Sequence, residues 1–182
     1  FIEDLEIPTP RVKLDLGALR KQAGVGRIML ELEPVFEELS PDLVVVVGDV
    51  DSTLAAALVA ARQQIPCAHV EAGLRSFDHS MPEEINRLVT DALADILWTP
   101  SQDADENLAR EGVAPEKIQR VGNIMIDSLE MLRETIEKQN AWGELNLNAG
   151  EYGLVTLHRP SNVDDPHILK RLCKALIDIA KQ

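Results

Sequence analysis

The stretch LVVVVGDVDSTLAAALVAARQQIPCAHVEA, residues 43–72, decides the fold class of this chain. It opens with LVVVV, an unalternating β-branched run that is typical of a central, parallel strand covered on both faces. Asp51 and Ser52 suit the cap of an alanine-rich helix over residues 53–63, and Pro66 precedes a second buried strand, CAHVEA. A strand, a helix and a second strand in this order predict a right-handed crossover unit.

The same alternation of helices and strands continues on both sides of this unit. Strands that alternate with helices of roughly 10 to 15 residues indicate a parallel sheet. The predicted fold class is therefore α/β, with a doubly wound, Rossmann-like parallel sheet. Further helices are predicted over 28–39, 82–94, 101–111, 124–138 and 165–182, with a possible helix near 15–23, and further strands over 96–99, 117–121 and 152–158.

A candidate linker divides the chain. The segment NAWGELNLNAG, residues 140–150, is rich in Asn and Gly and has no sustained apolar period. We therefore expect a first Rossmann-like domain over residues 1–139 and the start of a second over 151–182. The sequence begins with Phe1 and ends within an amphipathic helix, so we expect a fragment whose first domain is incomplete.

Composition and charge argue against several classes of partner. The 182 residues carry a formal net charge of -13, whereas nucleic acids and anionic membranes select basic patches. No signal-peptide pattern opens the sequence, and its apolar runs are far shorter than the ~18 residues of a membrane span. Cys67 and Cys173 lie in apolar patterns without metal-type spacing, which predicts reduced core thiols in a cytoplasmic protein.

Polar side chains follow the predicted strands at their carboxyl ends, where open parallel sheets bind ligands. Asp49 follows LVVVVG, Glu71 follows CAHV, and His158 with Arg159 follows GLVTL. The charged loop over residues 72–83 joins the same edge. Helix N-termini near Ser52, Pro82 and Ser161 are expected to present free backbone N–H groups to a phosphate.

Several of these residues also have structural explanations. Asp49 suits a helix cap, and the segment from Ser80 to Glu83 fits a capping box. Glu83 also stands four residues before Arg87, the spacing of an ordinary helix ion pair. We expect His69 to be a buried core histidine. We favour a functional role for Glu71, because its position at the end of a buried strand leaves little room for a solvated side chain.

Nucleotide motifs add one alternative. The glycine at position 48 is followed by Asp49 without the lysine of a P-loop or the glycines of a dinucleotide fingerprint, which argues against ATP and nicotinamide. Asp49 and Asp51 do form an Asp-x-Asp pair, which in some glycosyltransferases holds a divalent metal against a nucleotide diphosphate. A metal-dependent glycosyltransferase therefore stays open as an alternative.

Four segments together resemble the non-hydrolysing UDP-N-acetylglucosamine 2-epimerases. They are PDLVVVVGDVDSTLAAALVA (41–60), IPCAHVEAGLRSFDHSMPEEINRLVTDALAD (65–95), VGNIMIDSL (121–129) and VTLHRPSNVDD (155–165). The resemblance implies a two-lobed, glycosyltransferase-B-like fold. It also implies inversion of carbon 2 of a UDP-sugar by elimination and re-addition of UDP, for cell-surface polysaccharide precursors. No cofactor and no metal ion are implied, and the full-length protein is expected to be a homodimer.

The resemblance assigns a role to each candidate residue. Asp49, Glu71 and Glu83 match catalytic carboxylates of the first lobe, and His158 matches a catalytic histidine of the second. The substrate contacts are expected from Asp49, Glu71, His158 and Arg159. Apart from the resemblance, we expect Arg75 and Arg87 to be partners of these acids rather than contacts of the substrate.

Some expectations rest on departures from the family pattern. Asp51 stands where Asn or Thr is more usual, and Ser161 stands where the family has Glu. The family's opening strand and its Ser-Gly-Gly nucleotide loop are missing from the sequence, so the fragment alone is expected to bind UDP poorly. An epimerase for a related UDP-diacetamido sugar and a hydrolysing 2-epimerase remain open as alternatives.

Overall fold

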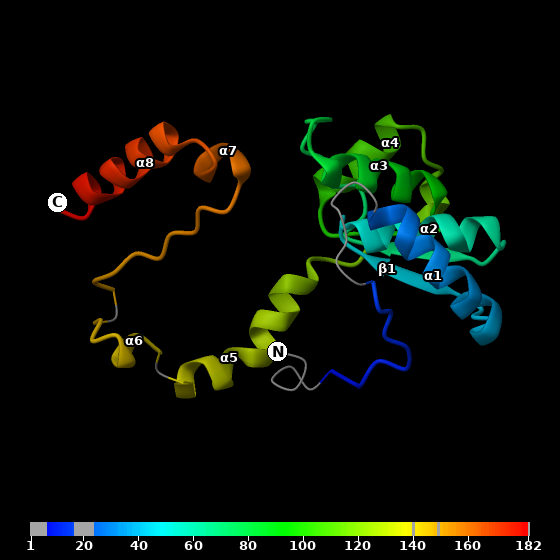
Figure 1. Cartoon of the computed structure of the whole chain (residues 1–182), viewed down its shortest axis with the longest axis horizontal. Helices are drawn as coiled ribbons and strands as arrows, with labels where there is room; N and C mark the ends of the chain where they lie inside the picture. The colour runs from blue at the N-terminus through cyan, green and yellow to red at the C-terminus, as the bar shows by residue number, and fades with distance from the viewer. Residues whose placement is uncertain (1–6, 17–23, 140, 149, 182) are drawn as a thin grey trace. The chain divides into compact units, whose positions relative to one another are not determined.

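A computed structural model describes residues 7–16, 24–139, 141–148 and 150–181 (Figure 1). The chain divides into two compact units, Phe1–Glu130 and Met131–Gln182. Most of the possible helix near 15–23, and positions 140 and 149 of the predicted linker, lie outside the described residues.

The first unit is built on a parallel sheet of four strands in the order β1-β2-β3-β4. Each strand pairs with the next one along the chain, which confirms the α/β class and the parallel pairing. The strands are β1 (Val44–Val47), β2 (Cys67–Val70), β3 (Ile96–Thr99) and β4 (Ile118–Arg120).

Helices connect these strands, as the alternation predicts. The predicted Asp51–Ser52 cap is wrong: α2 begins at Asp51 itself, and its N-cap residue, Val50, makes no side-chain cap hydrogen bond. A carboxylate in the first turn still suits the positive end of the helix dipole. The helices of this unit are α1 (Gly24–Leu39), α2 (Asp51–Arg62), α3 (Pro82–Leu93), α4 (Gln102–Arg110), the 3-10 helix η2 (Pro115–Lys117) and the start of α5 (Ile124–Gln139).

One face of the sheet holds the core. Val44 and Val46 of β1 are buried with Cys67 against the small residues Ala57 and Ala60 of α2. Small side chains let the helix lie close to the strands. Further along the sheet a second buried cluster is formed by Ala72, Ala94, Leu97 and Leu108.

β1 departs from its prediction. It is an edge strand of the described sheet rather than a central one, and its burial alternates along VVVV. Val45 and Val47 are about half exposed, so the strand is not covered on both faces by the described residues. A run of β-branched residues predicts that a strand forms. Whether both faces of that strand are buried depends on segments elsewhere in the chain.

The two cysteines differ. Both are free, and Cys67 is buried, as predicted. Burial, with the nearby Asp95 carboxylate, raises the pKa of the Cys67 thiol to about 11. Cys173 lies exposed on α8 (Pro166–Ile179), so the prediction of a core thiol is wrong there. An amphipathic pattern marks one face of a helix without showing what packs on it.

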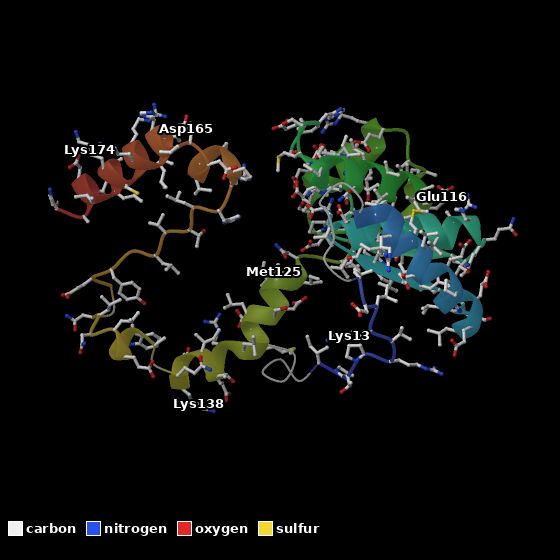
Figure 2. The ribbon with its side chains drawn as sticks, in the orientation of Figure 1. Lys13, Glu116, Met125, Lys138, Asp165 and Lys174 are labelled. Carbon is white, nitrogen blue, oxygen red and sulfur yellow. The ribbon has the colours of Figure 1, made fainter. Side chains whose placement is uncertain are left out.

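The second unit contains the rest of α5, the short helices α6 (Ala141–Glu144) and α7 (Pro160–Val163), and α8. The Asp165 side chain caps α8 by accepting a hydrogen bond of 2.8 Å from the N–H of His167. Figure 2 shows Asp165 at the start of this helix and Lys174 further along it. No helix among the described residues is both long and apolar enough to cross a bilayer.

The strand predicted over residues 152–158 is not formed in the described structure. Leu154 in this segment is 88% exposed. A strand needs a neighbour to satisfy its backbone N–H and C=O groups, and no described segment of this unit forms one. The prediction of a strand here is therefore wrong for the described chain.

Candidate active site

The turns that follow β1 and β2 carry the predicted acids Asp49 and Glu71. The N–H of Gly48 donates to Val70 O at 3.1 Å, so the two turns begin side by side. A Cβ built on Gly48 would lie 3.6 Å from Glu71 Oε2, which places the Glu71 carboxylate over the turn after β1. The two strands therefore deliver both acids to the same edge of the sheet.

Glu71 has an unusual backbone. Its φ is 68°, in the left-handed region that costs a residue with a side chain about 1–2 kcal/mol. Its carboxylate makes no hydrogen bond or ion pair with any described residue. Strained backbone of this kind is concentrated at functional sites. Both observations favour the functional explanation of Glu71.

A hollow of about 350 Å³ lies at the same edge. Asp49 reaches it from the end of β1, and Glu83 reaches it from the first turn of α3. The structure therefore brings two of the three predicted catalytic carboxylates to one hollow. Its other lining residues are Val50, Asp51, Pro82 and Asn86.

The structural explanations of Glu83 are not borne out. The N-cap of α3 is Met81 without a side-chain cap hydrogen bond, and the Ser80 hydroxyl donates to Asp78 Oδ1 at 2.6 Å instead. The predicted capping box is therefore wrong. The predicted ion pair with Arg87 is wrong as well, because Arg87 pairs with other acids. Glu83 is exposed, and among the described residues its carboxylate has no partner.

Arg87 links the sheet edge to α3. One guanidinium nitrogen contacts Asp49 Oδ2, and another lies 2.8 Å from Glu84 Oε2. Because Asp49 bonds Arg87 with its side chain and is not the N-cap of α2, its explanation as a helix cap is wrong. The pairing neutralises part of the negative charge beside Glu83.

Glu84 is the important residue that the sequence analysis passed over. Its side chain is 1% exposed, and it accepts hydrogen bonds from the N–H groups of Ser76 and Phe77 and from the Ser76 hydroxyl, at 2.9–3.0 Å. Burial raises the pKa of Glu84, but these donors and Arg87 outweigh it and hold the pKa below its usual value. Glu84 thus anchors the loop between β2 and α3.

Asn86 was also missed. It is buried on α3, and its Nδ2 donates to the carbonyl oxygen of Asp49 at 2.9 Å and to Asp51 Oδ1 at 3.1 Å. Asp51 is therefore held by an amide and Asp49 by Arg87, which does not favour the Asp-x-Asp metal pair. Within the described ranges, no group of three or more His, Cys, Asp and Glu is placed to hold a metal ion.

Arg75 does not pair with the predicted catalytic acids. Its side chain is 1% exposed, and its Nη1 lies 2.7 Å from Asp91 Oδ2. Its Nε and Nη2 lie 2.8 and 2.6 Å from the two carboxylate oxygens of Glu111. Burial lowers the pKa of Arg75, but Glu111 and Asp91 outweigh it and raise the pKa. Arg75 therefore fastens the loop after β2 to α4.

His158 and Arg159 belong to the second unit. Both are exposed and lie directly before α7, which begins at Pro160, close to the helix start expected near Ser161. Their meeting with the carboxylates of the first unit around one substrate stays a prediction.

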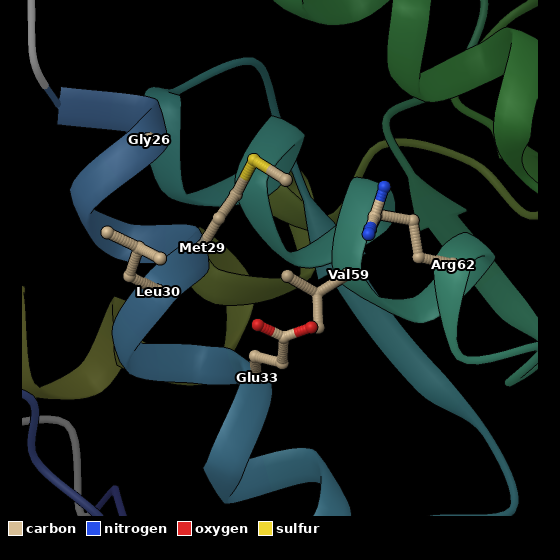
Figure 3. Close-up of a pocket in the computed structure, with 6 residues that line it drawn as sticks. All are labelled: Gly26, Met29, Leu30, Glu33, Val59 and Arg62. Atoms are coloured by element: carbon tan, nitrogen blue, oxygen red, sulfur yellow. The ribbon is translucent and has the colours of Figure 1, made fainter.

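A second hollow, of about 260 Å³, lies between α1 and α2 (Figure 3). Met29 and Leu30 of α1 and Val59 of α2 make it largely apolar, and Glu33 and Arg62 are its charged lining residues. None of the predicted site residues lines it. It therefore adds nothing to the candidate active site.

Comparison with known proteins points in one direction. The family model described as UDP-N-acetylglucosamine 2-epimerase matches residues 1–182. A UDP-N-acetylglucosamine 2-epimerase homolog of Methanococcus maripaludis is 43% identical over 180 residues, covering 98% of this chain and 50% of the relative. The UDP-2,3-diacetamido-2,3-dideoxy-D-glucuronate 2-epimerase of Pseudomonas aeruginosa is 42% identical over 182 residues, with the same coverage.

Solved structures agree. The crystal structure of the Methanocaldococcus jannaschii UDP-GlcNAc 2-epimerase in complex with UDP-GlcNAc and UDP matches with a TM-score of 0.88 and 41% identity. The match covers 99% of this chain and 50% of that one. The chain therefore spans about half the length of the relatives that it matches.

Proposed function

This chain belongs to the UDP-N-acetylglucosamine 2-epimerase family, and from that premise we propose that the complete protein inverts carbon 2 of UDP-N-acetylglucosamine. The product is UDP-N-acetylmannosamine, a precursor of cell-surface polysaccharides. The observation that carries the proposal is the pair of acids, Asp49 and Glu83, that line one hollow, with Glu71 over the adjoining turn. Proton transfer at a carbon atom requires acid and base groups of this kind.

The proposed first step is an elimination. A carboxylate takes the proton from carbon 2, and the electron pair of that C–H bond forms a double bond between carbons 1 and 2. The bond between carbon 1 and the UDP oxygen breaks, and UDP leaves with its electron pair. This route suits a proton that no neighbouring carbonyl group activates.

The second step reverses the first, except that the proton reaches carbon 2 on the opposite face of the sugar. The UDP oxygen adds to carbon 1, and a carboxylic acid delivers a proton to carbon 2. Removal and return of the proton on opposite faces require more than one acid–base group. Asp49, Glu71 and Glu83 supply three, and the two steps together need no redox cofactor.

Positively charged and hydrogen-bond-donating groups stabilise the departing diphosphate in this proposal. His158 and Arg159 of the second unit donate hydrogen bonds to it as its charge grows. Arg87 holds Asp49 in place instead of contacting the substrate, because its guanidinium is already engaged by two carboxylates. The family resemblance further supports a cytoplasmic homodimer as the working form of the complete protein.

A second candidate is an epimerase for a UDP-2,3-diacetamido sugar acid. The Pseudomonas aeruginosa relative with that activity is as similar to this chain as the relatives named for UDP-N-acetylglucosamine. The chemistry at carbons 1 and 2 is the same for both substrates, so the three acids keep their roles. Only the substituents at carbons 3 and 6 differ.

The test is an NMR assay in deuterated water with the complete protein. We expect UDP-N-acetylmannosamine to form from UDP-N-acetylglucosamine, with deuterium at carbon 2 of the product. Epimer formed with protium retained at that carbon contradicts proton exchange with solvent. Turnover of the diacetamido sugar alone supports the second candidate, and release of free N-acetylmannosamine with UDP supports a hydrolysing enzyme. Loss of activity with EDTA favours the metal-dependent alternative.

A further inference from the structure

A buried histidine connects the turns that carry two of the proposed catalytic acids. His69 of β2 is 0% exposed, which confirms the predicted core histidine. Its Nε2 lies 2.8 Å from the carbonyl oxygen of Gly48, and its Nδ1 lies 2.6 Å from Asp91 Oδ1 on α3. Both ring nitrogens of this buried side chain therefore have a partner inside the fold.

The partners of Asp91 fix its orientation. Its other oxygen, Oδ2, accepts the N–H of Gly73 at 3.0 Å and lies 2.7 Å from Arg75 Nη1. Both partners of Oδ2 are donors, and they hold the carboxylate so that Oδ1 faces the His69 ring.

The partners of His69 orient its ring. A backbone carbonyl oxygen accepts hydrogen bonds only, and Asp91 Oδ1 is a carboxylate oxygen, so each ring nitrogen of His69 faces an oxygen. Arg75 extends the network, because its guanidinium lies between Asp91 and Glu111.

The network spans both turns of the candidate active site. Gly48 directly precedes Asp49, and Gly73 follows Glu71 by two residues. The path from the Gly48 carbonyl through His69 and Asp91 to the Gly73 amide therefore joins the turn after β1 to the turn after β2.

We propose that the His69–Asp91 pair is a positioning device that fixes the backbones of Asp49 and Glu71 relative to one another. The inference rests on the proposed function for its catalytic consequence. Neither residue touches substrate. Displacement of a catalytic group by about 1 Å costs up to about 100-fold in rate, so the pair controls kcat through the acids it holds.

The kinetic test uses the complete protein and three variants. His69→Leu removes both ring donors, and Asp91→Asn keeps the shape but removes the charge. Cys67→Ala is the matched control, because Cys67 is buried on the same strand and the same face, two residues away from His69. We expect kcat to fall about 10-fold to 100-fold in the first two variants with KM within about 2-fold. In Cys67→Ala we expect a lower unfolding midpoint with kcat and KM unchanged.

A spectroscopic test does not depend on activity. In protein labelled with ¹⁵N-histidine, a ring N–H proton of His69 should resonate far downfield, as expected of a short hydrogen bond to Asp91. The signal should be lost in His69→Leu and should move upfield in Asp91→Asn. Absence of a downfield ring signal in the wild-type protein overturns the proposal, as does an unchanged kcat in both variants of an active enzyme. A wild-type protein that turns over no UDP-acetamido sugar refutes the proposed function instead, and leaves the spectroscopic result to decide the pair.

Discussion

Arg87 on α3 forms an ion pair with Asp49 at the end of β1, a residue 38 positions away in the sequence. The second branch of the same guanidinium holds Glu84, whose side chain is 1% exposed. The Arg87 guanidinium therefore binds two carboxylates with different roles. Asp49 lines the hollow, and Glu84 anchors the loop between β2 and α3.

Replacement of Arg87 by Met should weaken both attachments. The change leaves the buried Glu84 carboxylate without its charged donor, so we expect a loss of about 1–3 kcal/mol in the free energy of unfolding. Arg87→Lys keeps the charge but lacks the two-branched guanidinium, so it should recover only part of the loss. Urea unfolding of the three proteins measures this. Equal stability of Arg87→Met and wild type would contradict the role of the ion pairs.

Glu84→Gln should release the loop between β2 and α3. Phe77 in that loop is 67% exposed and has a left-handed φ of 58°, a conformation that the hydrogen bond from its N–H to Glu84 helps to hold. We expect chymotrypsin to cleave after Phe77 faster in the variant than in the wild type. The control is Glu116→Gln, an exposed acid beside β4. Cleavage at wild-type rate in Glu84→Gln would show that Glu84 does not anchor the loop.

The same substitution tests a pH dependence. The pKa of folded Glu84 lies below its ordinary value of 4.5, so the ionised form stabilises the fold above that pH. The stabilisation is lost as the pH falls through the folded pKa. The difference in unfolding free energy between wild type and Glu84→Gln should therefore be constant above about pH 5 and shrink below it. A difference that grows on acidification would reverse the sign and refute the assignment.

Gly73 should tolerate no side chain. Its φ is 80°, and a Cβ would lie 2.5 Å from the carbonyl oxygen of Ala104. Gly112 has a φ of 84° with nothing within 4 Å of the same position, so it is a matched control. We expect Gly112→Ala to cost about 1–2 kcal/mol of unfolding free energy, and Gly73→Ala to cost a further 1–3 kcal/mol, roughly, from the clash. Equal losses in urea unfolding would contradict the close approach of this loop to α4.

The two thiols should react at different rates. Cys173 is exposed, whereas Cys67 is buried with a pKa raised to about 11, so it is protonated at neutral pH. We expect a thiol reagent to modify Cys173 rapidly in the native protein and Cys67 only on unfolding. Cys173→Ser identifies the fast site. Fast labelling that persists in this variant would show that Cys67 is accessible.

The sequence predicted those parts of the fold that depend on residues close together along the chain. Apolar periodicity and turn residues located the four strands and the α-helices α1 to α5, because both depend on neighbours along the chain, whereas the short helix η2 was not predicted. The cover of β1 could not be predicted in this way, since the exposure of Val45 depends on distant segments. The strand expected over residues 152–158 failed for the same reason, because it requires a pairing partner.

The sequence predicted where two acids of the candidate site lie better than it predicted the ion pairs. Asp49 and Glu71 were expected at strand ends, because parallel sheets bind ligands at that edge. The predicted partner of Arg87 was wrong, because helix spacing alone allows either Glu83 or Glu84. Adjacent residues of a helix point about 100° apart, so two successive acids face different surroundings. The helical period therefore predicts that the two acids differ, and the structure shows that Glu83 lines the hollow while Glu84 holds the loop.

In the proposed mechanism Glu83 acts on the substrate, whereas its neighbour Glu84 supports the fold. The most direct test is the turnover number of Glu83→Gln in the complete protein, with Glu116→Gln as the control. Glu83 has no partner among the described residues, so we expect unfolding free energy to change by less than about 0.5 kcal/mol while kcat falls at least about 100-fold. A Glu83→Gln protein that turns over UDP-N-acetylglucosamine at the wild-type rate would contradict a catalytic role for Glu83.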